Sequence, residues 1–141
     1  MAAALLVVVA VGCGSVKYRP LRAGECLPAS SDVVGLREQD PARVPCSATH
    51  RYEVYATESL SLGPDWPGQG PVDEAAKQAC YSAFAGAVGV DPADLGPGID
   101  VVHIAPSEQS WNTAGDRAVE CLVRIPEQAG RFVHGTAVTG T

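Results

Sequence analysis

Five cysteines in a chain with few aromatic side chains are the feature that most constrains how this protein can fold. Of the 141 residues, 46% are hydrophobic but only 6% are aromatic, so burial must rest on small aliphatic side chains, which bring less apolar area each. A chain of this length suits one domain with a modest core. No C-x-x-C pair or metal-finger spacing occurs, which disfavours zinc. We therefore expect covalent crosslinks to stabilise the fold.

The apolar run that ends at Cys13 predicts where the protein works. Residues 2–13 resemble a bacterial lipoprotein export signal: the run ends on small residues and is shorter than the roughly 20 apolar residues that span a bilayer. The resemblance implies that residues 1–12 are a signal peptide, cut before a Cys13 that carries a lipid. The alternative is a buried N-terminal strand with a core cysteine. Because no lysine or arginine precedes Leu5, we expect the natural start to lie upstream.

The next residues and the charge of the chain fit a domain held by lipid at the extracytoplasmic face of the membrane. Residues 13–22 are polar or basic and contain Pro20, which predicts a lipidated tether before a domain of residues 23–141. The formal net charge is -6 and the sequence pI is about 4.9. Nucleic acid is excluded as a partner on this basis, because binding phosphate needs a clustered basic face.

With Cys13 assigned to the lipid, four cysteines remain: Cys26, Cys46, Cys80 and Cys121. Four cysteines allow three connectivities, and their order in the chain does not decide among them. We favour Cys26 with Cys46 and Cys80 with Cys121, because each bond then closes its own half of the chain. Loop-closure entropy would make each bond worth about 3 to 4 kcal/mol. Together they would be comparable with the net stability of a small domain.

Residues 44–71 read as a strand followed by a loop. From Val44 to Thr57 the pattern alternates, with Val54 on one face and Glu53 and Tyr55 on the other, which predicts a half-buried strand. Prolines and glycines then recur through residues 61–71, so we expect a loop there.

The second half of the chain predicts one helix and three strands. Val72–Val88 places Ala76, Cys80, Phe84 and Val88 four residues apart, which is typical of a buried helical stripe. The strand candidates are Ile99–Ala105, Ala118–Ile125 and Arg131–Val138. In the second of these, Cys121 points inward, where it can meet Cys80 if the helix packs on the sheet. The expected fold is α+β: a small antiparallel sheet packed by one main helix and stapled by two disulfides.

The cysteines and their neighbours resemble the septum formation domain family, which occurs mostly in exported or membrane proteins of high-GC Gram-positive bacteria. The matching pieces are Leu21–Cys26, Val44–His50, Glu53–Tyr55, Cys80 with Phe84, Pro106–Trp111 and Gly115–Cys121. Family members usually carry proline where this chain has Thr49. The resemblance implies an envelope protein with a role in cell division, and it implies no particular chemistry.

His50 and Glu53 are the first pair of candidate binding residues. They follow a disulfide cysteine and could contact a ligand together, although a lone histidine more often satisfies local hydrogen bonds in a turn. His103 and His134 lie on separate strand candidates. Because the three histidines share no ligand spacing, we expect no metal site.

Trp66, Trp111, Asp116 and Arg117 are the remaining candidates. Arg117 could bind a carboxylate or phosphate with two hydrogen bonds. The alternative is that Asp116 fixes a turn while Arg117 packs on Trp111 in a cation-π contact. Trp66, in the proline- and glycine-rich loop, is either an exposed interface anchor or the lid of a small core.

Catalytic motifs are absent from the sequence, which contains no G-x-S-x-G elbow, H-E-x-x-H motif or phosphate-binding loop. We therefore expect a non-catalytic module, without cofactor, that binds an envelope protein or a cell-wall component. One alternative is a cell-wall-acting envelope enzyme, or an accessory to one, with His50, Glu53 and Asp116 as acid–base candidates. Another is a purely stabilising cap on an unknown partner.

Overall fold

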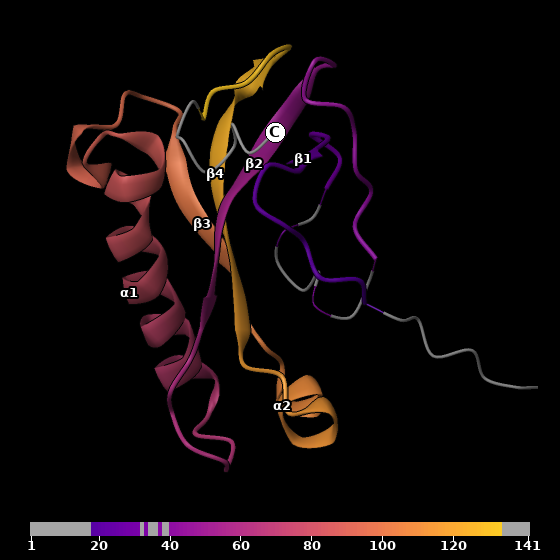
Figure 1. Ribbon diagram of the computed structural model, residues 1–141, viewed down its shortest axis with the longest axis vertical. Helices are drawn as coiled ribbons and strands as arrows, with labels where there is room; N and C mark the ends of the chain where they lie inside the picture. The colour runs from indigo at the N-terminus through magenta and orange to yellow at the C-terminus, as the bar shows by residue number, and fades with distance from the viewer. Residues whose placement is uncertain (1–17, 32, 34–36, 38–39, 134–141) are drawn as a thin grey trace, which may run out of the picture.

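An antiparallel sheet with strand order β1-β2-β4-β3 organises the chain in the computed structural model, which describes residues 18–31, 33, 37 and 40–133 (Figure 1). Along the chain, the elements are β1 (Cys26–Leu27), β2 (His50–Ser59), helix α1 (Gln69–Val88), the 3-10 turn η2 (Pro92–Asp94), β3 (Asp100–Ile104), helix α2 (Glu108–Ala114) and β4 (Ala118–Gln128). The expected α+β fold with two disulfides is confirmed. Both figures of the whole chain show β1 and β3 at opposite sides of the sheet.

The two long strands, β2 and β4, pair along most of their length and form the centre of the sheet. The strand predicted from Val44 begins instead at His50, and Val44 makes only an isolated bridge to Cys26. The prediction of a half-buried strand is wrong as well, because Val54 and Tyr55 are each 1% exposed on opposite faces. The register of β2 against β4 is irregular between Val54 and Ala56.

Helix α1 covers one face of the sheet through the predicted stripe. Ala76, Cys80 and Phe84 of this stripe are fully buried, as is Val72, whereas Val88 is only half-buried. The hydroxyl of Tyr55 on β2 donates to the Cys80 carbonyl oxygen at 2.7 Å, so helix and sheet are joined by a polar bond as well as by apolar contact. The helix begins three residues before the predicted Val72, and it ends where Gly89 takes a left-handed conformation.

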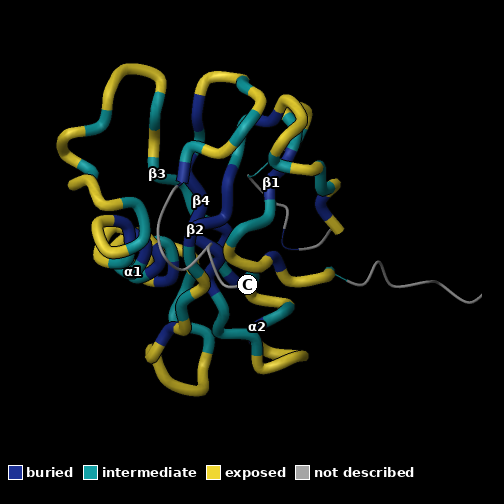
Figure 2. The backbone as a smooth tube through the Cα atoms, turned by 45° about the horizontal axis from the view of Figure 1, so that its top comes forward, coloured by how far each residue is buried: buried dark blue, intermediate teal, exposed yellow. Residues whose placement is uncertain are grey.

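Two cores lie on the two faces of the sheet, and Figure 2 shows the buried residues gathered along β2 and β4. The larger core is shared with α1. The smaller one lies on the opposite face, where Leu21, Leu27, Val54, Ile104 and Leu122 pack together. Because Leu21 is 1% exposed, the packed structure begins inside the stretch expected to be a tether.

The disulfides are those favoured from the sequence. Cys26 bonds to Cys46 with a Cα–Cα distance of 5.3 Å, and Cys80 bonds to Cys121 at 5.2 Å. The first bond fastens β1 to the loop before β2. The second fastens α1 to the central strand β4 inside the larger core.

Helix α2 and the segment after β4 differ from expectation. Trp111 lies in α2, a helix that was not among the predicted elements and whose start is closed by a capping box between Ser107 and Ser110. Residues 131–133 are not part of a strand, and the rest of the strand predicted over Arg131–Val138 lies outside the described residues, as do Cys13 and His134.

Candidate functional site

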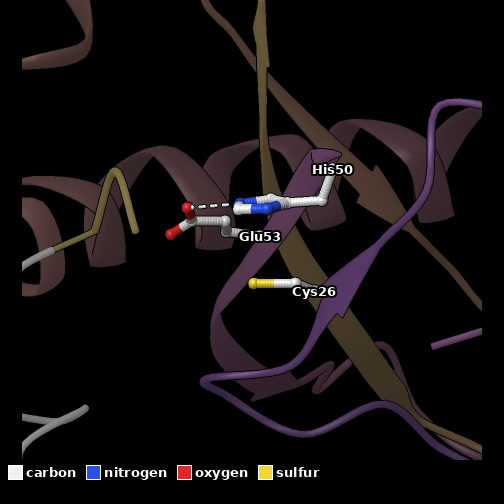
Figure 3. A group of neighbouring side chains, drawn as sticks. All are labelled: Cys26, His50 and Glu53. Atoms are coloured by element: carbon white, nitrogen blue, oxygen red, sulfur yellow. Dashed lines mark hydrogen bonds and ion pairs between the residues drawn. The ribbon is translucent and has the colours of Figure 1, made fainter. Parts of the chain in front are cut away.

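His50 and Glu53 form a buried pair at the start of β2. Their side chains are 0% and 1% exposed, and His50 Nε2 lies 2.8 Å from Glu53 Oε1 (Figure 3). The other ring nitrogen lies 2.8 Å from the Ala48 carbonyl oxygen. Glu53 also accepts hydrogen bonds from the backbone N–H groups of Phe132 and Val133, at 2.6 and 2.9 Å. The pair therefore ties the segment after β4 onto β2. Its hydrogen-bonding atoms are used within the fold and do not face solvent.

Cys26 lies beside this pair, and the three side chains place possible metal-binding atoms within 4.8 Å of one another (Figure 3). The sulfur of Cys26 is bonded to Cys46, however, and a cysteine binds zinc only as a free thiolate. His50 and Glu53 are also committed to backbone partners. The cluster is therefore a disulfide packed against a hydrogen-bond network, and its donor set does not fit a metal.

A second buried network, which the sequence analysis missed, joins Arg37 to β4. Arg37 Nη2 lies 2.7 Å from Glu120 Oε2, and the two residues are 5% and 1% exposed. Arg37 also donates to the carbonyl oxygens of Ile104, Ala105 and Ala118. The one sequence signal was a glutamate in the middle of an apolar strand, because a buried carboxylate needs a cation from elsewhere in the chain.

Burial sets the electrostatics of this second network. It raises the pKa of Glu120, and the adjacent Arg37 opposes that rise. Burial also raises the pKa of Tyr18, with the negative charge of Glu120 adding to the effect. The ring of Tyr18 lies against the guanidinium group, whose central carbon is 5.0 Å from the ring centre. These groups are held by one another and present no free charge for a ligand.

Trp111 and Arg117 anchor the loop between β2 and α1. The guanidinium carbon of Arg117 lies 3.5 Å from the centre of the Trp111 ring, and both side chains donate to the Pro64 carbonyl oxygen at 3.0 Å. Trp66 is half-buried and packs edge-on against Trp111. Asp116 accepts from the Ala118 N–H group in the turn before β4. These contacts are structural, and a role in binding a partner stays a prediction.

A groove of about 800 Å³ lies along the outer edge of β3. Residues 101–105 form its floor. Gln69 and Asp73, from the first turns of α1, line one side, whereas Val33 and Arg37 line the other. None of the binding residues predicted from the sequence lines this groove. His50 with Glu53 and Trp111 with Arg117 instead form two separate clusters.

A family model described as "Septum formation" matches residues 23–140. The chain belongs to this family. Membership in the septum formation family implies a cell-envelope protein with a role linked to cell division. No curated protein and no solved structure matches the chain. Within the described ranges, neither α1 nor any other helix has the length and apolar character needed to span a membrane.

The residues by which the septum formation resemblance was recognised do mainly structural work in this chain. They supply the disulfides, the Glu53 acceptor, the Trp111 anchor and the turn at Asp116. The centre of the groove, from Val101 to His103, lies outside those pieces. Pro106 and Ser107, which also line the groove, do belong to those pieces, and the family model spans the whole groove.

Proposed function

We propose that the protein is a lipid-anchored, non-catalytic interaction module on the extracytoplasmic face of the membrane, where it serves septum formation. The observation that carries the binding role is that the buried acid–base candidates are already used: His50 and Glu53 bond to each other and to backbone groups. Because these polar side chains are bonded within the fold, we infer that the module acts through its surface. Its partner is an envelope protein or a cell-wall component.

Two further observations support the proposed extracytoplasmic location of this module. The two disulfides suit an oxidising compartment outside the cytoplasm. Family membership supports a link to septum formation. Lipid attachment rests on the sequence around Cys13, which lies outside the described residues.

The enzyme alternative needs His50, Glu53 and Asp116 to face one cleft. His50 and Glu53 are buried, whereas Asp116 lies in the turn before β4, with Oδ2 3.6 Å from Arg37 Nε. We therefore do not favour this alternative. Hydrolysis of purified cell-wall polymer by the protein, lost in Glu53→Gln, would restore it.

Imaging tests the proposed function directly. A C-terminal fluorescent fusion that tolerates export is followed in growing cells, with a membrane dye marking the septa. We expect enrichment at new septa, and a matched fusion of an unrelated lipoprotein gives the uniform background. A uniform signal from both fusions would contradict a septal role and leave a general envelope-binding role to pursue.

A further inference from the structure

The hydrogen bonds of β4 determine which of its residues face β3. Leu60 N–H donates to the Arg117 carbonyl oxygen at 2.9 Å, so the polar backbone groups of Arg117 point toward β2. Along an antiparallel strand this direction alternates from one residue to the next. Glu120 and Leu122 therefore direct their N–H and C=O groups toward β3.

The open edge of β3 follows from this alternation. Leu122 pairs with Val102, so the polar groups of Val102 are used within the sheet. Its neighbours, Val101 and His103, must then direct their N–H and C=O groups away from β4. Among the described residues, no strand pairs with that side of β3. Such an edge is a template for adding another strand.

The open edge is limited in length. Arg37 Nε donates to the Ala105 carbonyl oxygen at 2.9 Å, which closes one end. At the far side of the sheet, β1 covers part of β2 and is fastened by the Cys26–Cys46 disulfide. Among the described residues of the sheet, Val101–His103 therefore combine unpaired backbone N–H and C=O groups with the groove.

The two sides of the groove differ in chemistry. Toward α1, the Asp73 carboxylate is half exposed, accepts a hydrogen bond from Gln69 at 2.9 Å and lies 3.8 Å from His103 Nε2. Within the described residues, no lysine or arginine forms an ion pair with Asp73. On the opposite side, Val33 and Val102 pack against the smaller core and offer apolar surface.

The charges of the groove select its occupant. The cation on its wall, Arg37, is already paired with Glu120, which leaves Asp73 as the carboxylate of the groove that has no lysine or arginine partner among the described residues. The whole chain carries a formal net charge of -6, which also attracts a cationic partner. The chain's own residues 134–141 contain no lysine or arginine and do not fit this requirement.

We propose that the β3 edge binds an extended segment of an envelope protein by strand addition, with cationic side chains beside Asp73 and apolar side chains beside Val102. This inference rests on the proposed interaction function. Backbone bonds to Val101 and His103 would supply affinity, and the two walls would supply specificity because side chains of a strand alternate between faces.

Synthetic heptapeptides test the proposal on the full chain, purified in detergent with both disulfides intact. A peptide of alternating valine and lysine should bind, and should slow hydrogen exchange at the amides of Val101 and His103. A peptide of alternating valine and glutamate should bind at least tenfold more weakly. Backbone N-methylation of alternate residues provides a further control: one of the two patterns should abolish binding and the other should not.

Two helix variants test the charge. Asp73→Asn should weaken binding of the valine–lysine peptide about two- to fivefold, the range expected for a partly exposed ion pair. Glu74→Gln is the matched control, because Glu74 is the exposed neighbour on α1 and does not line the groove. Equal effects of the two substitutions, or of the two methylation patterns, would overturn the proposal.

The other possible occupants give different results. Protection of Val101 and His103 that grows with protein concentration and needs no peptide would show a second copy of this chain on the edge. Protection that is independent of concentration, and that disappears when residues 134–141 are deleted, would show the chain's own C-terminal segment there. Either result overturns the assignment to a partner protein.

Photo-crosslinking in cells separates this inference from the function on which it rests. A crosslinking side chain is placed at His103 in the groove or at Tyr81, which is 44% exposed on α1 and lines no part of the groove. A reproducible adduct from position 103 that becomes weaker in Asp73→Asn supports binding of the partner in the groove. An adduct from Tyr81 alone overturns the groove and leaves the interaction function standing. No adduct from either position counts against both.

Discussion

Glu53 and Glu120 are carboxylates buried within a sheet of largely apolar residues, and each is held by partners distant in sequence. Glu53 accepts backbone bonds from residues 79 and 80 positions away, whereas Glu120 meets a side chain 83 positions away. A buried carboxylate without such partners would strongly oppose folding. Glu53 therefore fastens the C-terminal end of the described chain to β2, and Glu120 fastens Arg37 to β4.

Replacing Glu53 by alanine should lower the free energy of unfolding by about 3 kcal/mol, because His50 and two backbone N–H groups lose their acceptor. Urea denaturation measures this loss, and hydrogen exchange should show faster opening at Phe132 and Val133. Glu127→Ala is the control: Glu127 is 52% exposed in a surface pair with Arg51, so the loss should be less than about 1 kcal/mol. Equal losses would mean that Glu53 does not clamp the segment.

Glu120 should make stability depend on pH. Burial raises its folded-state pKa above the ordinary 4.5, so the folded protein holds this proton more tightly than the unfolded chain does. The stability contributed by Glu120 is therefore fully present below about pH 4.5 and is lost as the pH rises through the folded-state pKa.

Comparison with Glu120→Gln isolates this effect, since glutamine does not titrate. We expect the stability of the native protein, measured relative to this variant by urea denaturation, to fall as the pH is raised from 4 toward 7, a range chosen to begin below the ordinary carboxyl pKa. A difference that grows in favour of the native protein would show that attraction to Arg37 outweighs burial.

Helix α1 and strand β4 are the elements that the larger core depends on, and the Cys80–Cys121 bond joins them. Both cysteines are fully buried, and the residues between them include the whole of β3 and α2. The other disulfide closes a shorter loop at the side of the sheet. Cutting the two bonds should therefore have unequal effects.

The double variant Cys80→Ala/Cys121→Ala should lose about 4 kcal/mol, whereas Cys26→Ala/Cys46→Ala should lose about 3 kcal/mol, following sequence separations of 41 and 20. Non-reducing urea denaturation measures both losses. A larger loss from Cys26→Ala/Cys46→Ala would contradict this order and make the side of the sheet the more critical region. Peptide mapping of Cys80→Ser should find the free thiol on Cys121.

The molecule as a whole is an acidic domain for which we propose attachment by lipid. Its formal net charge of -6 repels anionic headgroups, so electrostatic adhesion cannot replace an anchor. Attachment by acyl chains, in contrast, does not depend on salt.

Membrane fractionation distinguishes the two modes of attachment. The native protein should stay with membranes through a wash in high salt, and Cys13→Ser should move to the soluble fraction, because the thiol that receives the lipid is gone. Cys46→Ser serves as the control for loss of a cysteine elsewhere, since it should remain bound to membranes. Retention of Cys13→Ser would refute the anchor.

The sequence by itself determined helix α1 and the fold class, and it favoured the cysteine pairing that the structure then showed. These features depend on spacing within one element or on chain connectivity: residues four apart share one face of a helix, and a cysteine on that face can meet one on the strand beneath it. The family model matches residues 23–140, which contain these elements.

Only the tertiary structure decided which faces and edges of the sheet are covered. The pattern around Tyr55 predicts one buried face, but Leu21 and Leu27 pack on the second face. Apart from Glu120, which needs a cation such as Arg37, no local pattern in β2 or β4 predicts this second core. The groove likewise exists because α1 on one side, and Val33 and Arg37 on the other, flank β3 while no described strand pairs with its outer edge. Hydrophobic periodicity shows which residues of one element share a face. Which faces and edges of the sheet are covered by other segments is set by long-range packing.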